Sequence, residues 1–142
     1  KRLRGVTCYA SDDLDRFLSR TNVLVNFLPL TPATEGLLNA HLFARLPRGA
    51  CLVNLARGGH VVDADLVAAL DSGQLGGAML DVFNDEPLAA DHPFWKHPRI
   101  IVTPHVAAVT LASEAAAQVI ANLQRLERGE APLGAVDRNL GY

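Results

Sequence analysis

The sequence predicts an α/β fold built on a doubly wound parallel sheet, and two observations carry that prediction. Four strongly apolar runs recur along the chain: VLVNFL (23–28), ACLVNL (50–55), GAMLDVF (77–83) and RIIVTP (99–104). The stretches between most of them have the apolar spacing of helices. Strands that are apolar throughout and alternate with helices are typical of a parallel sheet covered on both faces.

The helices are expected from apolar periodicity and from residues suited to helix ends. Ser11 and Asp63 suit the first position of a helix, and Gly73 and Gly129 suit the residue after the last turn. On these signals the predicted helices span residues 11–20, 34–46, 63–73 and 110–128. The apolar stripe of the last helix indicates a packed face.

Size and composition are those of a globular domain. The 142 residues are 49% hydrophobic and 20% charged. A net charge of −2 gives no basic surface for nucleic acid or anionic membranes. No apolar run approaches the roughly 18 residues of a membrane span. Cys8 and Cys51 lie in apolar segments, so we expect reduced core cysteines in a cytoplasmic protein.

Three chemically active residues follow three predicted strands. Arg57 comes after 50–55, Glu86 after 77–83 and His105 after 99–104. The carboxyl ends of parallel strands share one edge of a sheet, where the ligand crevice of this architecture lies. We therefore expect these side chains to converge, and Gly58 and Gly59 to let the backbone turn sharply behind Arg57.

Such a set suits a substrate that carries a carboxylate beside a carbonyl. Arginine can bind the carboxylate through two parallel hydrogen bonds, and histidine can donate a proton to the carbonyl oxygen. A glutamate bonded to the second ring nitrogen would fix the tautomer. The hydride has to come from a cofactor. The alternative is a surface arginine, a helix-capping glutamate and a loop histidine without a shared role.

Two segments resemble the signature of the D-isomer-specific 2-hydroxyacid dehydrogenases. These are VNLARGGHVVDADLVAALDSGQLGGAMLDVFNDEPL and WKHPRIIVTPHVAAVT. GVTCY, LPLTPATEGLLN and VDRNLGY further resemble the glyoxylate/hydroxypyruvate reductase A branch. The resemblance implies the C-terminal part of a Rossmann-type domain over 1–108. It also implies that 109–142, a C-terminal helix and tail, return toward a substrate domain that is mostly absent and contribute to a homodimer.

The resemblance also implies roles for individual residues. Arg57 would bind the substrate, His105 would be the general acid/base, and Glu86 would orient His105. The residues implied to line the cofactor are Leu28, Pro29, Thr34, Leu55, Ala56, Arg57, Asp81, His105, Ala107 and Ala108. Lys1, with Arg2 and Arg4, would lie near an adenosine 2′-phosphate, which favours NADP with NAD as the alternative.

The chain departs from the family pattern in extent, because it has no glycine-rich pyrophosphate loop. We therefore expect these residues alone to have poor activity or none. Glyoxylate or hydroxypyruvate is the expected substrate; another D-2-hydroxyacid or phosphite specificity, or a nucleotide-sensing corepressor-like protein, stays open.

Several polar residues are expected to have ordinary structural roles. His60 is expected to be a solvent-facing loop residue and His41 a partly buried helix residue. An acid inside a strand is costly unless paired, so Asp81 is expected to form hydrogen bonds near the nicotinamide. No His, Cys or Asp cluster has the spacing of a metal site.

Overall fold

The fold is described from a computed structural model, which covers residues 4–138. Within these residues a four-stranded sheet has the order β1-β2-β3-β4, and its neighbouring strands are parallel. The strands are β1 (Val23–Asn26), β2 (Ala50–Asn54), β3 (Leu75–Leu80) and β4 (Ile100–Val102). The predicted parallel sheet is confirmed. Each strand is shorter at its carboxyl end than its apolar run, because the chain there turns into the edge loops.

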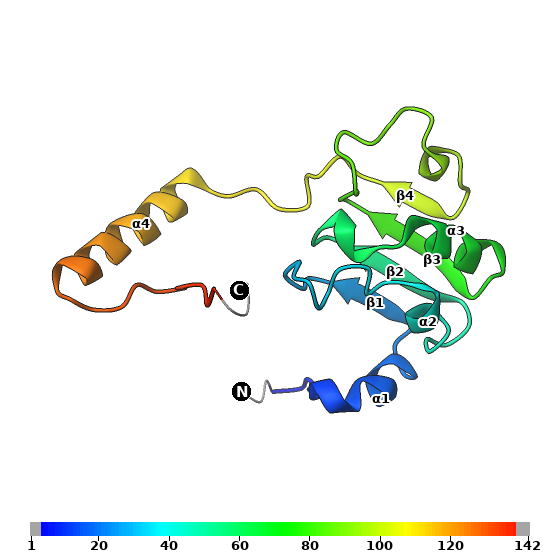
Figure 1. The fold of residues 1–142 in the computed structure, drawn as a ribbon, viewed down its shortest axis with the longest axis horizontal. Helices are drawn as coiled ribbons and strands as arrows, with labels where there is room; N and C mark the ends of the chain where they lie inside the picture. The colour runs from blue at the N-terminus through cyan, green and yellow to red at the C-terminus, as the bar shows by residue number, and fades with distance from the viewer. Residues whose placement is uncertain (1–3, 139–142) are drawn as a thin grey trace.

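The helices and short 3-10 turns precede, connect and follow the strands, with η1 and α1 before β1 and α4 after β4 (Figure 1). They are η1 (Ser11–Asp13), α1 (Leu14–Leu18), α2 (Ala40–Phe43), η2 (Gly58–His60), α3 (Asp63–Asp71), η3 (Pro93–Trp95) and α4 (Ala112–Glu127). Neither Ser11 nor Asp63 caps a helix with its side chain, contrary to prediction.

The predicted helix over 34–46 is reduced to the short α2. Asn39 caps α2, since its side chain accepts a hydrogen bond from the Leu42 amide. The Asp65 carboxylate, in α3, accepts from the Ala40 amide at 2.9 Å. Contacts distant in sequence therefore set where this helix begins.

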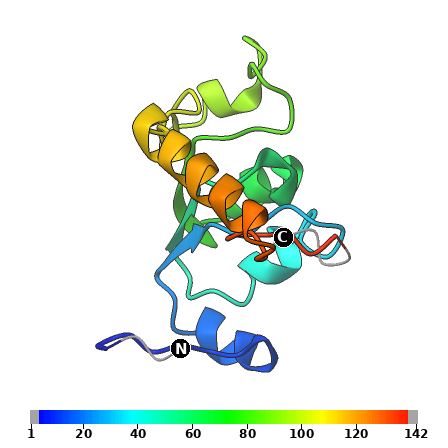
Figure 2. The same ribbon diagram turned by 90° about the vertical axis from the view of Figure 1, so that its left-hand side faces the viewer.

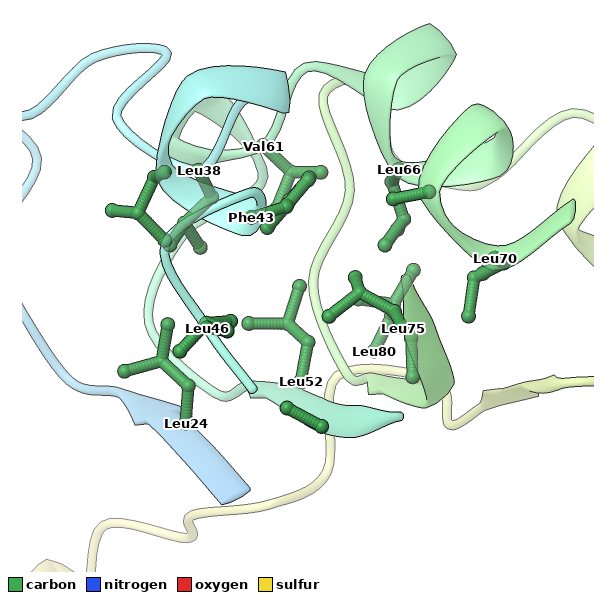
Figure 3. Packing of buried hydrophobic residues seen from close by; sticks show 14 of the residues in the cluster. Leu24, Leu38, Phe43, Leu46, Leu52, Val61, Leu66, Leu70, Leu75 and Leu80 are labelled. Carbon is green, nitrogen blue, oxygen red and sulfur yellow. The ribbon is translucent and has the colours of Figure 1, made fainter. Parts of the chain in front are cut away.

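The core lies between the sheet and the helices α2 and α3 (Figure 3). Leu52 and Leu75 of the sheet are fully buried, as are Phe43 of α2 and Leu66 and Leu70 of α3. Burying a leucine side chain stabilises a fold by about 2 kcal/mol, so this layer dominates the stability of the domain.

The opposite face of the sheet is open to solvent in the part of the chain that the structure describes. Val23 and Val25 of β1 are 56% and 45% exposed, and Ile101 of β4 is 62% exposed. The burial of β1 alternates strictly along the strand. The prediction of helices on both faces therefore holds for one face only.

Helix α4 stands apart from the sheet at the end of an extended stretch (Figure 1). In the view turned by 90° it lies in front of the sheet (Figure 2). It has no buried residue, and its apolar stripe of Val119, Ile120, Leu123 and Leu126 is exposed. The prediction of a packed face is wrong for the described residues, because its only near neighbour is the tail. Asn122 exchanges hydrogen bonds with the Leu133 backbone, and Arg125 donates to the Ala131 carbonyl.

Smaller corrections concern the cysteines and one histidine. Cys8 is exposed and Cys51 is half-buried, so neither is the core residue that was expected. His41 is exposed rather than partly buried. No helix within residues 4–138 has the length and apolar character needed to cross a bilayer.

Candidate active site

The polar residues that follow β2, β3 and β4 lie at the carboxyl edge of the sheet, as the parallel topology requires. The nearest pair is His105 and Glu86, whose Nδ1 and Oε2 atoms are 2.8 Å apart. Both side chains are partly open to solvent, with 49% and 37% exposed. A ligand at this edge can therefore reach Nε2 of the His105 imidazole while Nδ1 stays bonded to the Glu86 carboxylate.

Glu86 is held at both of its carboxylate oxygens. Oε2 faces His105, and Oε1 accepts the Phe83 backbone N–H at 3.0 Å. The hydrogen bond from His105 lowers the pKa of Glu86 most, the Phe83 bond and the charges of His105 and Arg57 lower it further, and partial burial opposes them. Glu86 is thus an ionised, oriented acceptor at neutral pH.

Asp81 anchors the loop that carries His105. It is 1% exposed, and its carboxylate accepts from the Thr103 hydroxyl and from the Val106 and Ala107 amides. Burial acts to raise the pKa of Asp81, but these hydrogen bonds outweigh it, and the His105 charge adds to them, so the pKa is lowered. The hydrogen-bond partners of Asp81 are thus residues of the protein itself. The sequence did not indicate these partners.

The anchored loop holds His105 in an uncommon backbone conformation. Its φ is 55°, in the left-handed region that residues other than glycine rarely adopt. Such a conformation persists only where the surroundings hold it. The hydrogen bonds that the Val106 and Ala107 amides donate to the Asp81 carboxylate provide that hold. The orientation of the imidazole is therefore fixed from both sides, by Asp81 below and by Glu86 beside it.

Arg57 lies on the same edge but makes no hydrogen bond to Glu86 or His105 within residues 4–138. Its Nη1 donates to the Ala56 carbonyl at 2.6 Å, and the residue is exposed. Its charge nevertheless contributes to the lowered pKa of Glu86. The guanidinium is thus within electrostatic reach of the pair and retains free donors for an anion.

Gly58 is required by close backbone approach and not by a sharp turn. Its φ is not positive, contrary to what the glycine pair suggested. A Cβ atom at this position would lie 1.9 Å from the Phe83 carbonyl carbon. The turn after Arg57 therefore packs directly against the loop that leads to Glu86.

Two hollows flank these residues. One of about 650 Å³ is lined by residues 27–30 and 55–57, which include the predicted cofactor residues Leu28, Pro29, Leu55, Ala56 and Arg57. A second, of about 210 Å³, is lined by His105, Glu86, Trp95 and their apolar neighbours. Arg57 lines the first hollow and the His–Glu pair the second, so the structure does not place all three in one cavity.

The other predicted cofactor residues are placed differently. The Thr34 hydroxyl donates to the Pro29 carbonyl at 2.7 Å, inside the loop that follows β1. Ala107 and Ala108 are exposed and lead toward α4. Lys1 lies outside the described residues. The cofactor contacts of all these residues remain predictions.

Two features of this edge were missed. Asn26 and Asn54, paired in register, join β1 to β2 through a buried hydrogen bond of 3.0 Å between their side chains. The signal was present, since both strands end in Val-Asn. His60, predicted to face solvent, is 0% exposed. Within residues 4–138 no three His, Cys, Asp or Glu side chains are placed to hold a metal ion.

Comparison with known proteins gives a matching family and close structural neighbours. Residues 4–107 match the model of the D-isomer specific 2-hydroxyacid dehydrogenase, NAD binding domain. The sequence resemblance to that family is thereby confirmed, and so is the Rossmann-type assignment of the sheet.

Three solved structures resemble the whole chain. A D-isomer specific 2-hydroxyacid dehydrogenase from Xanthobacter autotrophicus Py2, in complex with NADPH and MES, is 45% identical with a TM-score of 0.95. An NADPH-dependent glyoxylate/hydroxypyruvate reductase from Sinorhizobium meliloti, with NADP and sulfate, is 45% identical with a TM-score of 0.94. A probable 2-hydroxyacid dehydrogenase from Rhizobium etli CFN 42, with NADP, HEPES and L(+)-tartaric acid, is 41% identical with a TM-score of 0.92.

Each of these structures matches 100% of the present chain. The chain in turn spans 59%, 47% and 46% of the Xanthobacter, Sinorhizobium and Rhizobium chains. It thus corresponds to about half of the length of two of these relatives.

Proposed function

The chain belongs to the D-isomer-specific 2-hydroxyacid dehydrogenase family, and on that premise we propose that the protein carrying it reduces a small 2-oxoacid to a D-2-hydroxyacid with NADPH. Glyoxylate and hydroxypyruvate are the proposed substrates. The observation that carries the proposal is the 2.8 Å contact between His105 and Glu86, with the charge of Arg57 close enough to act on the same carboxylate.

The hollow lined by residues 27–30 and 55–57 fits one part of a dinucleotide. It lies at the carboxyl edge of the sheet, and its wall combines apolar side chains with the cation of Arg57. Leu28 and Pro29 would hold the adenosine side, and Leu55 and Ala56 the nicotinamide side. When bound, the cofactor supplies the hydride. NADPH is favoured over NADH, because the Xanthobacter, Sinorhizobium and Rhizobium structures hold NADPH or NADP.

The residues of this chain supply binding and a proton. Arg57 binds the substrate carboxylate through its free guanidinium donors. His105 gives the proton on Nε2 to the carbonyl oxygen as the hydride reaches the carbonyl carbon, which yields the 2-hydroxyacid and leaves the imidazole neutral. Glu86 stays ionised and accepts from Nδ1, which keeps the tautomer that places the other nitrogen toward the substrate.

The test is a steady-state assay on the protein expressed from its complete reading frame. The fall of NADPH absorbance is followed with glyoxylate and with hydroxypyruvate, for the unchanged protein and for Arg57→Ala. We expect Arg57→Ala to raise KM for the oxoacid strongly and the Kd for NADPH less, because Arg57 is only one part of the wall of the larger hollow. Arg16→Ala is the matched control, because Arg16 is an exposed arginine of α1.

Two outcomes would contradict the proposal. One is equal KM values in Arg57→Ala and the unchanged protein. The other is a protein that binds NADPH but reduces no 2-oxoacid, which would favour a nucleotide-sensing binding protein of the same fold.

The proposal extends to assembly and location. The full protein is proposed to be a cytoplasmic homodimer, in which the exposed apolar stripe of α4 contributes to the contact. Light scattering of the full protein, with Leu123→Glu as the variant, measures this. A monomer in the unchanged protein would contradict it.

A further inference from the structure

His60 is a fully buried histidine that the proposed mechanism does not use. It follows the glycine pair in η2, and its exposed fraction is 0%. Its Nδ1 lies 3.0 Å from the Arg57 carbonyl oxygen, and its Nε2 lies 3.3 Å from the Pro29 carbonyl oxygen. The ring therefore spans two loops that follow different strands.

Both of these loops line the larger hollow. Pro29 belongs to the loop after β1, Arg57 to the turn after β2, and each contributes to the wall of the cavity of about 650 Å³. Asn26 and Asn54 join the same two strands where these loops begin. The imidazole of His60 is thus a second connection, placed beyond the ends of the strands.

The chemistry of the two contacts is restrictive. A carbonyl oxygen can only accept, so a ring nitrogen bonds it only by donating. A ring with one N–H therefore bonds one of the two carbonyls at a time, and a ring with two N–H groups bonds both. The Arg57 carbonyl also accepts from the Asn54 amide at 2.9 Å, and the Pro29 carbonyl from the Thr34 hydroxyl at 2.7 Å. Neither carbonyl can turn to suit the ring without giving up these bonds. The position of the ring is therefore set by both loops together.

We propose that His60 is a positioning residue for Arg57, whose ring holds the Arg57 carbonyl against the loop after β1 and so couples the oxoacid-binding turn to the nucleotide-facing loop. This inference rests on the proposed function. Because the carbonyl and the side chain of Arg57 are joined to the same Cα, displacing the carbonyl displaces the cation. His60 itself is buried beneath the turn and touches neither reactant.

Two conservative variants separate the two contacts. The amide nitrogen of asparagine lies at the branch point occupied by Nδ1, and that of glutamine reaches the distance of Nε2. His60→Asn therefore keeps the donor toward Arg57, whereas His60→Gln keeps the donor toward Pro29. His41→Asn and His41→Gln are the controls, because His41 is an exposed histidine of α2.

The variants are measured in the full protein. We expect His60→Gln to raise KM for the oxoacid about tenfold with kcat less affected, as a lost hydrogen bond at a binding group does. We expect His60→Asn to keep that KM within about threefold and to raise the Kd for NADPH about fivefold instead. A role in stability alone would move both constants alike in both variants.

Amide hydrogen exchange gives a readout that needs no turnover. Exchange should rise in residues 27–34 of His60→Asn and in residues 57–62 of His60→Gln. Identical exchange patterns in the two variants, or patterns equal to that of the unchanged protein, would overturn the coupling. An unchanged protein that reduces no oxoacid would instead contradict the proposed function, and the exchange pattern would still decide whether His60 joins the loops.

Discussion

His105 and Glu86 are 19 residues apart in sequence, and their Nδ1 and Oε2 atoms lie 2.8 Å apart. They follow the adjacent parallel strands β4 and β3, so the sheet itself brings them together. The other oxygen of Glu86 is held by the Phe83 amide, and the backbone after His105 is held by Asp81. Glu86 cannot turn away without breaking its bond to the Phe83 amide, and the backbone that carries His105 cannot shift without breaking bonds to Asp81.

Replacing His105 tests the proton donor. We expect His105→Gln to lower kcat for 2-oxoacid reduction by about 10²–10⁴-fold, the usual contribution of general acid catalysis. The Kd for NADPH, measured by fluorescence, should change much less than kcat, since His105 is one of several residues implied to line the nucleotide. A variant that keeps a tenth or more of the activity would show that another group donates the proton.

The pH dependence of reduction tests the pair as a unit. The proposed reaction consumes one proton, which His105 donates, so kcat should fall toward alkaline pH. Because the pKa of Glu86 is lowered, its carboxylate is ionised across the neutral range and causes no further change of kcat with pH there. A pH-independent kcat between pH 6 and about 9 in the unchanged protein would contradict this assignment.

Glu86→Gln is the companion variant. It removes the charge and keeps the size, so Nδ1 of His105 loses its charged acceptor, and we expect kcat to fall about tenfold. The stability that ionised Glu86 contributes is complete above the ordinary glutamate pKa of 4.5 and is lost as the pH falls through the lower pKa of the folded state. An unchanged kcat in Glu86→Gln would show that the carboxylate does not assist His105.

Asp81→Asn tests the anchor below His105. An asparagine cannot accept all the hydrogen bonds that the Asp81 carboxylate accepts, so we expect a loss of about 2 kcal/mol in the free energy of unfolding at pH 7. The pKa of Asp81 is lower in the folded state than its ordinary value of 3.8. Its stabilising effect is therefore complete above that value and is lost as the pH falls through the folded-state pKa.

Urea unfolding at pH 7 and at about pH 3 measures both effects, and the two proteins should differ less at the lower pH. Asp12→Asn is the control, because Asp12 is exposed in η1. Equal midpoints of Asp81→Asn and the unchanged protein at pH 7 would show that the carboxylate does not hold the loop.

Gly58→Ala tests the close approach of the two loops. The added methyl would meet the Phe83 backbone at 1.9 Å, so the loops have to separate, at a cost of about 3 kcal/mol. Gly59→Ala is the matched control, because its methyl meets the flexible Leu30 side chain at 3.0 Å. Thermal unfolding compares them, and equal destabilisation of the two variants would count against the contact.

The sequence predicted the sheet and its functional edge because both follow from local patterns. Apolar runs between helical segments identify parallel strands, and the residues after each run then share an edge. The distances between the three side chains could not be predicted, because the pattern places Arg57, Glu86 and His105 on one edge without orienting their side chains. Arg57 and the His–Glu pair indeed line different hollows.

Predictions failed where the burial of a residue or the start of a helix depends on contacts with residues distant in sequence. His60 follows two glycines, which indicates an exposed loop, yet it is buried by a contact with Pro29, 31 residues away. The helix over 34–46 has adequate periodicity, but Asp65 and Asn39 fix its start at Ala40. The stripe on α4 has the pattern of a packed face, and pattern alone does not name the partner.

The open face of the sheet has a practical consequence for anyone who handles residues 1–142 alone. Val23 and Val25 lie on a strand that pairs on one side only within residues 4–138, so their backbone and side chains are both available to another copy. Such a polypeptide should precipitate as its concentration rises. A solubilising fusion partner is then a condition for obtaining it in solution.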